Sequence, residues 1–151
     1  MRSLLCVVLT AFIATSALAS DGSTPNEDQL FLEGIESNLS EYLWKKRPIV
    51  VFADTDADPR FQEQLERLRE NESALRDRDV VILSDTDPAA RSELRRTLRP
   101  RGFQLVLIGK DGSVILRKPF PWTVRELNRS IDKMPMRVRE IEERRQERAG
   151  E

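Results

Sequence analysis

The chain is organised around the stretch Arg47-Pro-Ile-Val-Val-Phe-Ala-Asp-Thr-Asp-Ala-Asp-Pro59, in which an unbroken apolar run is followed by three alternating aspartates. Residues 49–53 are apolar without polar alternation, which is typical of a central parallel strand buried on both faces. Ligands of open α/β sheets bind at the carboxyl ends of such strands. The loop from Asp54 to Asp58 is therefore the first place to look for a site.

The first nineteen residues differ from the rest of the chain. Arg2 supplies a positive charge, residues 4–18 are almost wholly apolar, and Ala17-Leu18-Ala19 offers the small residues that signal peptidase requires. We expect residues 1–19 to be a cleaved signal peptide, since the apolar run is shorter than the roughly 20 residues that cross a bilayer. An uncleaved membrane anchor is the alternative. The mature protein would begin at Ser20, be secreted or periplasmic, and insert no segment into a membrane.

The composition excludes several kinds of catalytic chemistry. The chain of 151 residues is 39% hydrophobic and 34% charged, as expected for one globular domain. It has no histidine, and its one cysteine, Cys6, lies in the expected signal peptide. The mature chain can therefore form no disulfide, perform no thiol redox chemistry and use no Ser-His or Cys-His nucleophile. We expect no cofactor and no metal.

The charge balance favours no class of partner. The chain has 25 Lys and Arg, one of which is Arg2, and 26 Asp and Glu, so the mature chain has a net charge of about −2. Such a charge gives no general attraction to nucleic acid or acidic membranes. The partner is expected to be an unknown protein or a small ligand, and the oligomeric state stays open.

Helix start signals and apolar spacing predict the other elements. Asp58-Pro59 and Asp87-Pro88 are N-caps followed by proline, and Thr123 with Glu126 forms a capping box. The Gly109-Lys110-Asp111-Gly112 turn predicts a hairpin. The expected helices are a short one carrying Leu30, Phe31 and Leu32 and ending at Gly34, then 59–76, 88–99 and 124–133; the strands are 49–53, 80–83, 103–108 and 114–116.

This order predicts an α/β fold, a thioredoxin-like β-α-β-α-β-β-α arrangement with a four-stranded mixed sheet flanked by helices. Three stretches also resemble the signatures of one family, domain of unknown function 4174, known as small secreted bacterial proteins and as a module in animal extracellular matrix and sushi-repeat proteins. The stretches are Leu39, Tyr42, Trp44-Lys45 and Arg47; residues 103–112; and residues 131–137 with Glu140. The resemblance implies a thioredoxin-like fold and secretion, but no catalytic residues.

We divide the chain accordingly. Residues 1–19 are the signal peptide, 20–38 an N-terminal extension, 39–136 the thioredoxin-like domain and 137–151 a charged helical tail that is expected to be solvated and to fray. Thioredoxins place Cys-x-x-Cys after the first strand, where this chain has residues 54–58, and a cis-proline before the third strand, where it has Gly102-Phe103. Both redox elements are absent, so the module is expected to be non-enzymatic.

The alternating aspartates allow two other interpretations. Asp54-x-Asp56-x-Asp58 copies the first ligands of an EF-hand, but Pro59 and Leu65 occupy the positions of the required glycine and glutamate. That excludes an EF-hand, while a weaker carboxylate site shared with Asp85 and Asp87 stays open. The favoured interpretation is that Asp58 and Asp87 are helix caps.

One enzymatic alternative remains. A strand followed by Asp54-x-Asp56, with a second strand that ends in Ser84, resembles the first motifs of haloacid-dehalogenase-like phosphatases. In such an enzyme Asp54 would be the nucleophile, Asp56 the acid/base and Mg²⁺ the cofactor. Such an enzyme also needs a lysine and a distal acidic pair at a further parallel strand. Here Lys110-Asp111 lies in a hairpin turn.

The two acidic loops should share one edge of the sheet, and the antiparallel third strand should begin there. We predict that Arg101 pairs with one of these carboxylates, with Arg99 as a second candidate, and that the pair reduces the field available to a divalent metal. A partly exposed pair of this kind orders a loop more than it stabilises a fold. The candidate partner-binding edge therefore comprises Asp54, Asp56, Asp58, Asp85 and Arg101.

Overall fold

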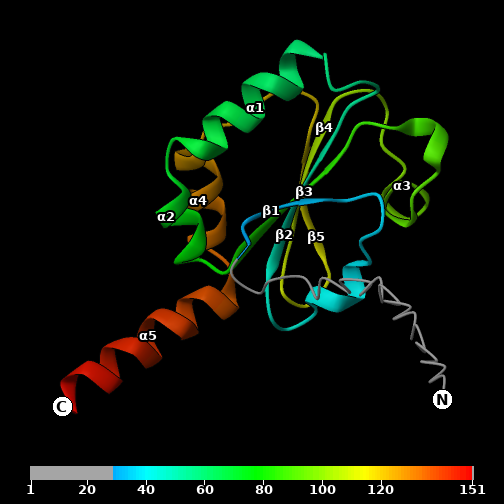
Figure 1. The fold of residues 1–151 in the computed structure, drawn as a ribbon. Helices are drawn as coiled ribbons and strands as arrows, with labels where there is room; N and C mark the ends of the chain where they lie inside the picture. The colour runs from blue at the N-terminus through cyan, green and yellow to red at the C-terminus, as the bar shows by residue number, and fades with distance from the viewer. Residues whose placement is uncertain (1–28, 151) are drawn as a thin grey trace, which may run out of the picture.

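A computed structural model describes residues 29–150 (Figure 1). Its centre is a five-stranded mixed sheet in the order β1-β3-β2-β4-β5. β1, β3 and β2 are parallel, while β4 is antiparallel to both β2 and β5. The strands are β1 (Phe31–Glu33), β2 (Arg47–Phe52), β3 (Val80–Asp85), β4 (Gln104–Ile108) and β5 (Val114–Lys118).

Helices cover both faces of this sheet, and one further helix projects from it (Figure 1). One face carries α1 (Pro59–Arg69), α2 (Glu72–Arg76) and α4 (Val124–Asp132), while α3 (Glu93–Leu98) covers the other. The last helix, α5 (Pro135–Ala149), starts beside the sheet and extends away from it. Two 3-10 turns, η1 (Leu39–Tyr42) and η2 (Pro88–Ala90), precede β2 and α3.

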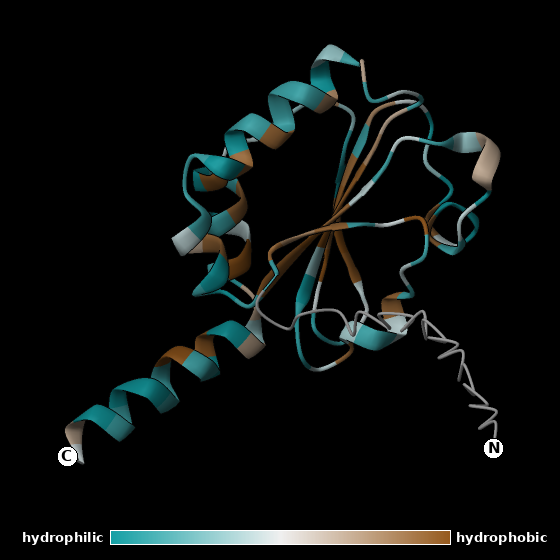
Figure 2. Ribbon diagram, in the orientation of Figure 1, coloured by the Kyte–Doolittle hydropathy of each residue, from teal (hydrophilic) through white to brown (hydrophobic). Residues whose placement is uncertain are grey.

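Alternate side chains of the central strands form two separate cores, one on each face of the sheet. Ile49 and Val51 of β2 pack under α1, α2 and α4, whereas Val50 and Phe52 pack with Leu94 and Leu98 of α3. Residues 49–53 are buried, as the uninterrupted apolar run predicts, and β2 also includes Arg47 and Pro48, which are buried too. The strands are the most hydrophobic part of the fold (Figure 2). No helix of residues 29–150 is long and apolar enough to cross a membrane; the expected signal peptide lies outside this range.

Residues 31–33 are where the sequence-based prediction of a helix was wrong. They form the edge strand β1, which pairs in parallel with β3 and gives the sheet five strands in place of four. Gly34 closes the strand by donating its N–H to the carbonyl of Ser84. A Cβ at Gly34 would lie 2.7 Å from Leu94 Cδ1 and 3.1 Å from Ser84 O, so a larger residue here would force the Leu94 side chain and the β3 backbone to shift. The proposed start signal at Thr24-Pro25 lies outside the described residues.

Two of the predicted helices are each divided by an internal cap. The expected helix 59–76 is interrupted at Asn71, whose side chain accepts a hydrogen bond from the N–H of Ala74 and begins α2. The expected helix 88–99 is broken at Arg91, which is left-handed with φ 48°, and restarts at the N-cap Ser92. Asparagine and serine are strong N-caps, and here each starts a new helix although the apolar spacing continues without a break.

Other elements follow the prediction. Thr123 and Glu126 form the reciprocal capping box at α4, and β4 and β5 form the antiparallel hairpin. The charged C-terminal segment is helical, but its first turns are held firmly by the domain, with Arg137 buried. α5 thus begins as part of the folded body.

Candidate functional site

The acidic edge predicted from the sequence exists in part. Asp54 and Asp56 lie in the loop after β2 with exposed side chains. The Asp56 carbonyl accepts a hydrogen bond from Gln62 Nε2 at 2.6 Å, which fixes the loop to the first turn of α1. These two carboxylates are the members of the edge that remain open to solvent.

Asp58 and Asp87 cap the elements that follow them, as expected. Asp58 Oδ1 accepts from the N–H of Arg60 at 2.9 Å, and Asp87 Oδ1 accepts from the N–H of Ala89 at 3.0 Å. The hydrogen bond from the Arg60 side chain holds the pKa of Asp58 below its usual value. Both aspartates therefore have a structural role.

Asp85, the last residue of β3, is buried in a closed cluster with α3. Its carboxylate accepts hydrogen bonds from Ser92 Oγ, from Arg95 Nε at 2.8 Å and from the Asp87 N–H at 3.1 Å. Arg95 also donates to the carbonyl of Ala53 at 2.7 Å and lies over the Phe52 ring at 5.3 Å. The cluster ties the carboxyl ends of β2 and β3 to α3 and leaves the Asp85 carboxylate no open position.

The prediction that Arg101 or Arg99 pairs with an aspartate of this edge was wrong. Arg95 pairs with Asp85, and within residues 29–150 neither Arg99 nor Arg101 forms an ion pair. The chain does return to this edge, since a Cβ on Gly102 would lie 4.0 Å from a carboxylate oxygen of Asp54. Across the described chain, no three acidic side chains are grouped closely enough to hold a metal ion.

A larger ionic network lies at the opposite end of the sheet, and the site prediction missed it. Arg47, the first residue of β2, is fully buried, with its guanidinium 2.9 Å from Glu140 of α5. Lys110, in the β4–β5 turn, lies 2.8 Å from Glu140 and 2.8 Å from Asp79. Burial alone would raise the pKa of Glu140, but hydrogen bonds and charge from Arg47 and Lys110 lower it to about 2. Glu140 is thus an anion shared by Arg47 and Lys110, and Arg137 of the same helix lies 3.5 Å from it as a third cation.

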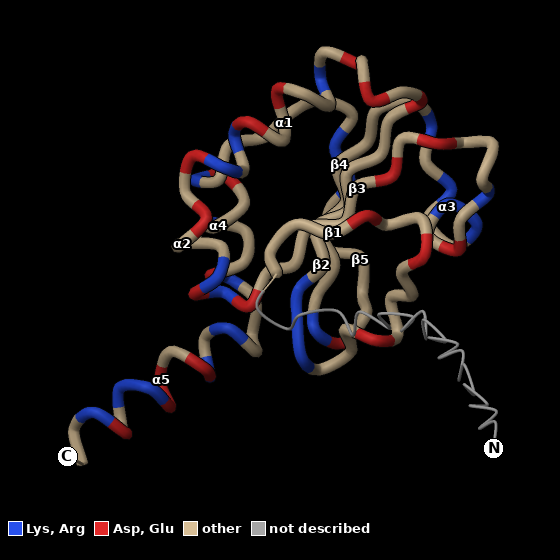
Figure 3. Tube along the Cα trace, viewed as in Figure 1, with Lys and Arg blue, Asp and Glu red and all other residues tan. Residues whose placement is uncertain are grey.

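Further pairs extend the network along α2 and α5, where charges of both signs gather (Figure 3). Arg78 binds both carboxylate oxygens of Asp132, at 2.9 and 2.8 Å. Arg137, buried, lies 2.8 Å from Asp77, which also accepts from Arg144 at 3.0 Å. The network joins α2, α4, α5, β2 and the hairpin turn into one rigid unit.

Exposed apolar residues lie beside this network. Trp44 is 66% exposed and holds a left-handed backbone with φ 63°, while its N–H donates to the carbonyl of Lys110 at 2.7 Å. Leu43 is also exposed and contacts the turn, since a Cβ on Gly112 would meet Leu43 Cδ2 at 2.9 Å. We call Leu43, Trp44 and turn residues 110–112 the Trp44 surface. Around the turn, Arg47, Lys110, Ile115 and Met134–Met136 line a pocket of about 140 Å³.

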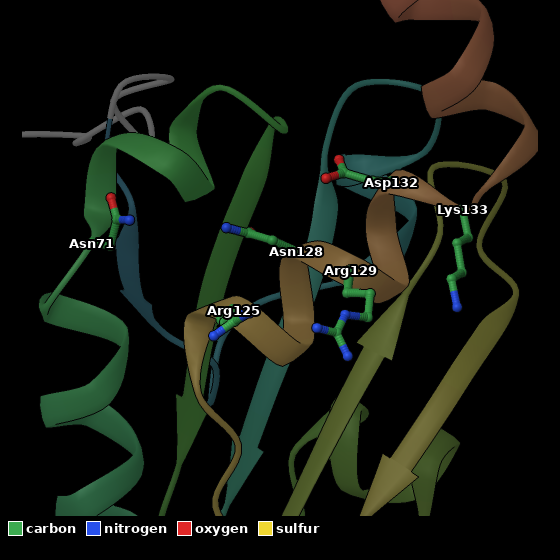
Figure 4. Close-up of a pocket in the computed structure, with 6 residues that line it drawn as sticks. All are labelled: Asn71, Arg125, Asn128, Arg129, Asp132 and Lys133. Atoms are coloured by element: carbon green, nitrogen blue, oxygen red, sulfur yellow. The ribbon is translucent and has the colours of Figure 1, made fainter.

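A third feature is an open hollow of about 660 Å³ between the start of α2 and the outer side of α4 (Figure 4). Its lining residues are all polar or charged, with two cations on α4 and a third at the C-cap of this helix. The lining residues are Asn71, Arg125, Asn128, Arg129, Asp132 and Lys133.

Comparison with known proteins identifies the family. A family model described as a domain of unknown function, DUF4174, matches residues 38–140. The chain belongs to this family. A search of curated proteins finds no match to the DUF4174 chain.

Solved structures show the fold. The chain is 13% identical to an uncharacterized thioredoxin-like protein from Clostridium perfringens, with a TM-score of 0.53, covering 79% of this chain and 91% of that one. It is 17% identical to a reduced 2-Cys peroxiredoxin of Plasmodium vivax, with a TM-score of 0.52 and coverage of 64% and 81%. It is 24% identical to the desulfothioredoxin of Desulfovibrio vulgaris Hildenborough, with a TM-score of 0.50, covering 68% of this chain and 97% of that one. The thioredoxin-like fold is confirmed.

The stretches that carry the DUF4174 resemblance meet in space. Trp44 and Arg47, the turn residue Lys110, and Arg137 with Glu140 all lie at the end of the sheet opposite the acidic edge. The sequence offered a signal for this end: a charged residue opening a wholly buried strand requires a distant partner of opposite charge. Neither the apolar pattern nor the helix caps could say which acid supplies it.

Proposed function

We propose that this DUF4174 protein is a secreted or periplasmic module that binds a partner protein through the Trp44 surface and performs no thiol chemistry. The observation that carries the proposal is the conformation and exposure of Trp44. An indole that is 66% exposed forgoes most of the stabilisation that burying it would give, and the backbone of a bulky residue at φ 63° is strained. Both features are explained when the indole is presented to a partner.

The backbone around Trp44 is held in place by the network below it. Its N–H bonds to Lys110, whose ammonium group is itself fixed by Asp79 and Glu140. Exposed tryptophans presented on a rigid support are typical anchors of protein interfaces, because they bury a large area at little cost in side-chain entropy. We expect the partner to offer an apolar pocket for the indole.

The absence of thiol chemistry follows from the residues of the mature chain. Where thioredoxins carry their cysteines, this domain has the loop Asp54–Asp58, and at the end of the neighbouring strand Asp85 is engaged by Arg95 and Ser92. Export rests on the charged, apolar and small-residue order of residues 1–19.

The phosphatase alternative uses Asp54 and Asp56, which are exposed. The lysine considered for it, Lys110, instead pairs with Asp79 and Glu140 at the other end of the sheet. Binding is therefore the better proposal.

Two assays on the purified mature chain separate the classes. We expect no insulin reduction with dithiothreitol, and no hydrolysis of p-nitrophenyl phosphate with Mg²⁺ beyond that of an Asp54→Asn variant. Insulin reduction by the pure chain would overturn the thiol-free account. Phosphate release that Asp54→Asn abolishes would replace the proposal with the phosphatase alternative.

A further inference from the structure

We infer that the outer side of α4 is a second binding surface, which takes an acidic, extended segment of a partner protein. Arg125, Arg129 and Lys133 follow one another at intervals of four residues, so they form a single exposed row along the helix. In the region that the structure describes, none of the three forms an ion pair, although many other arginines of the domain do. Repulsion between like charges at this spacing destabilises the helix. Glu126 on the same helix offsets it at Arg129 through charge alone, without an ion pair.

The hollow beside this row presents hydrogen-bond donors. Asn71 uses its carbonyl oxygen to cap α2, accepting from Ala74 N at 3.3 Å and Ser73 Oγ at 3.2 Å, so its NH₂ group remains to donate. The Asn128 side chain points from α4 toward α2 (Figure 4), and its unpartnered carbonyl oxygen is a buried acceptor that a ligand in the hollow does not reach, so it adds nothing to anion binding.

The one carboxylate in the lining is already neutralised. Both oxygens of Asp132 accept from Arg78, at 2.9 and 2.8 Å. A ligand that fits the hollow must therefore supply acceptors and negative charge.

The spacing of the row favours a peptide. Cations four residues apart on a helix are separated by about 6 Å along its axis, and alternate side chains of an extended chain by about 6.6 Å. Acidic residues at every second position of an extended segment can thus meet Arg125, Arg129 and Lys133 in turn. A single phosphate would engage only part of the row.

A nucleic acid fits less well. None of the residues lining the hollow is aromatic, and single strands are usually held by base stacking. The mature chain is also slightly acidic, so it lacks the general attraction that nucleic-acid binding requires. The inference goes beyond the proposed function, because the α4 row and the Trp44 surface belong to different elements.

The test is fluorescence anisotropy of the mature protein with a labelled Ser-Glu-Ser-Glu-Ser-Glu peptide at low ionic strength, beside a Ser-Gln-Ser-Gln-Ser-Gln peptide. We expect binding of the glutamate peptide alone, weakening as salt is added. Arg125→Gln, Arg129→Gln and Lys133→Gln combined should weaken it by about tenfold, since three exposed pairs at about 0.5 kcal/mol each amount to that factor.

The matched control changes the same number of charges elsewhere. Arg96→Gln, Arg99→Gln and Arg101→Gln combined remove three exposed arginines that form no ion pair within residues 29–150, and should leave the affinity unchanged. Circular dichroism checks that both variants fold. Equal weakening by both variants, or equal binding of the two peptides, would overturn the inference. So would tighter binding of inorganic phosphate or of a single-stranded DNA oligonucleotide than of the glutamate peptide. Trp44→Ala should keep the peptide affinity, which separates this test from that of the proposed function.

Discussion

The guanidinium of Arg47 lies 2.9 Å from the carboxylate of Glu140, although the two residues are 93 positions apart in the chain. Arg47 is fully buried at the start of β2, and Glu140 reaches it from the second turn of α5. The same carboxylate binds Lys110 at 2.8 Å. One anion therefore joins the central strand, the hairpin turn and the last helix.

Removing this anion should destabilise the domain strongly. Glu140→Ala leaves Arg47 buried without its counter-ion, and we expect the free energy of unfolding to fall by about 3 to 5 kcal/mol. Urea denaturation measures the change. Glu143→Ala, an exposed acid on the same helix, is the matched control and should change stability by less than about 0.5 kcal/mol. Equal effects of the two substitutions would show that the network contributes nothing specific.

The same interaction predicts how stability depends on pH. The pKa of Glu140 is lowered from 4.5 to about 2 in the folded state, so the unfolded state binds a proton more readily. The stabilisation by Glu140 is therefore fully present above about pH 4.5 and is lost as the pH falls toward 2. The stability difference between wild type and Glu140→Gln, measured by urea denaturation, should shrink over this range. A difference that stays constant down to pH 2 would contradict the assignment.

At the other edge of the sheet, the critical residue is Arg95. Arg95→Ala leaves the buried Asp85 carboxylate without its cation, and we expect a loss of about 3 to 5 kcal/mol in the free energy of unfolding. Thermal and urea unfolding of Arg96→Ala, its exposed neighbour, should be close to wild type. Arg101→Ala should also have little effect, because Arg95 and not Arg101 pairs with Asp85; a loss at Arg101→Ala as large as that at Arg95→Ala would contradict this pairing.

Processing of the N-terminus can be tested independently. We predict that the exported protein begins at Ser20, because residues 17–19 offer the small side chains that signal peptidase needs. The intact mass of the protein recovered from its native host decides this. A mass that includes residues 1–19 would mean that the segment remains as an anchor.

The sequence predicted those parts of the fold that depend on local chemistry. The apolar run of β2, the caps Asp58 and Asp87 and the capping box at Thr123 are each encoded within a few residues. β1 could not be found in this way, because its three residues become a strand only by pairing with β3.

The candidate sites depend on longer-range relationships. Arg95 pairs with Asp85 from a helix that restarts after Arg91, where an arginine adopts a left-handed backbone without any glycine signal. Glu140 contacts Arg47 because α4 and α5 place it beside the start of β2. Which acid pairs with which buried arginine is therefore determined by the topology, and the local sequence did not predict it.

The most direct test of the proposed function is site-specific photo-crosslinking in the native host. A benzoylphenylalanine replaces Trp44 in one variant and Phe120 in another; Phe120 is 52% exposed and follows β5, away from the Trp44 surface. We predict a discrete protein adduct from position 44 and not from position 120. The partner, once purified, should bind the Trp44→Ala variant about tenfold more weakly and the Phe120→Ala variant with wild-type affinity. No adduct at position 44, the same adducts at both positions, or unchanged affinity of Trp44→Ala would contradict the account.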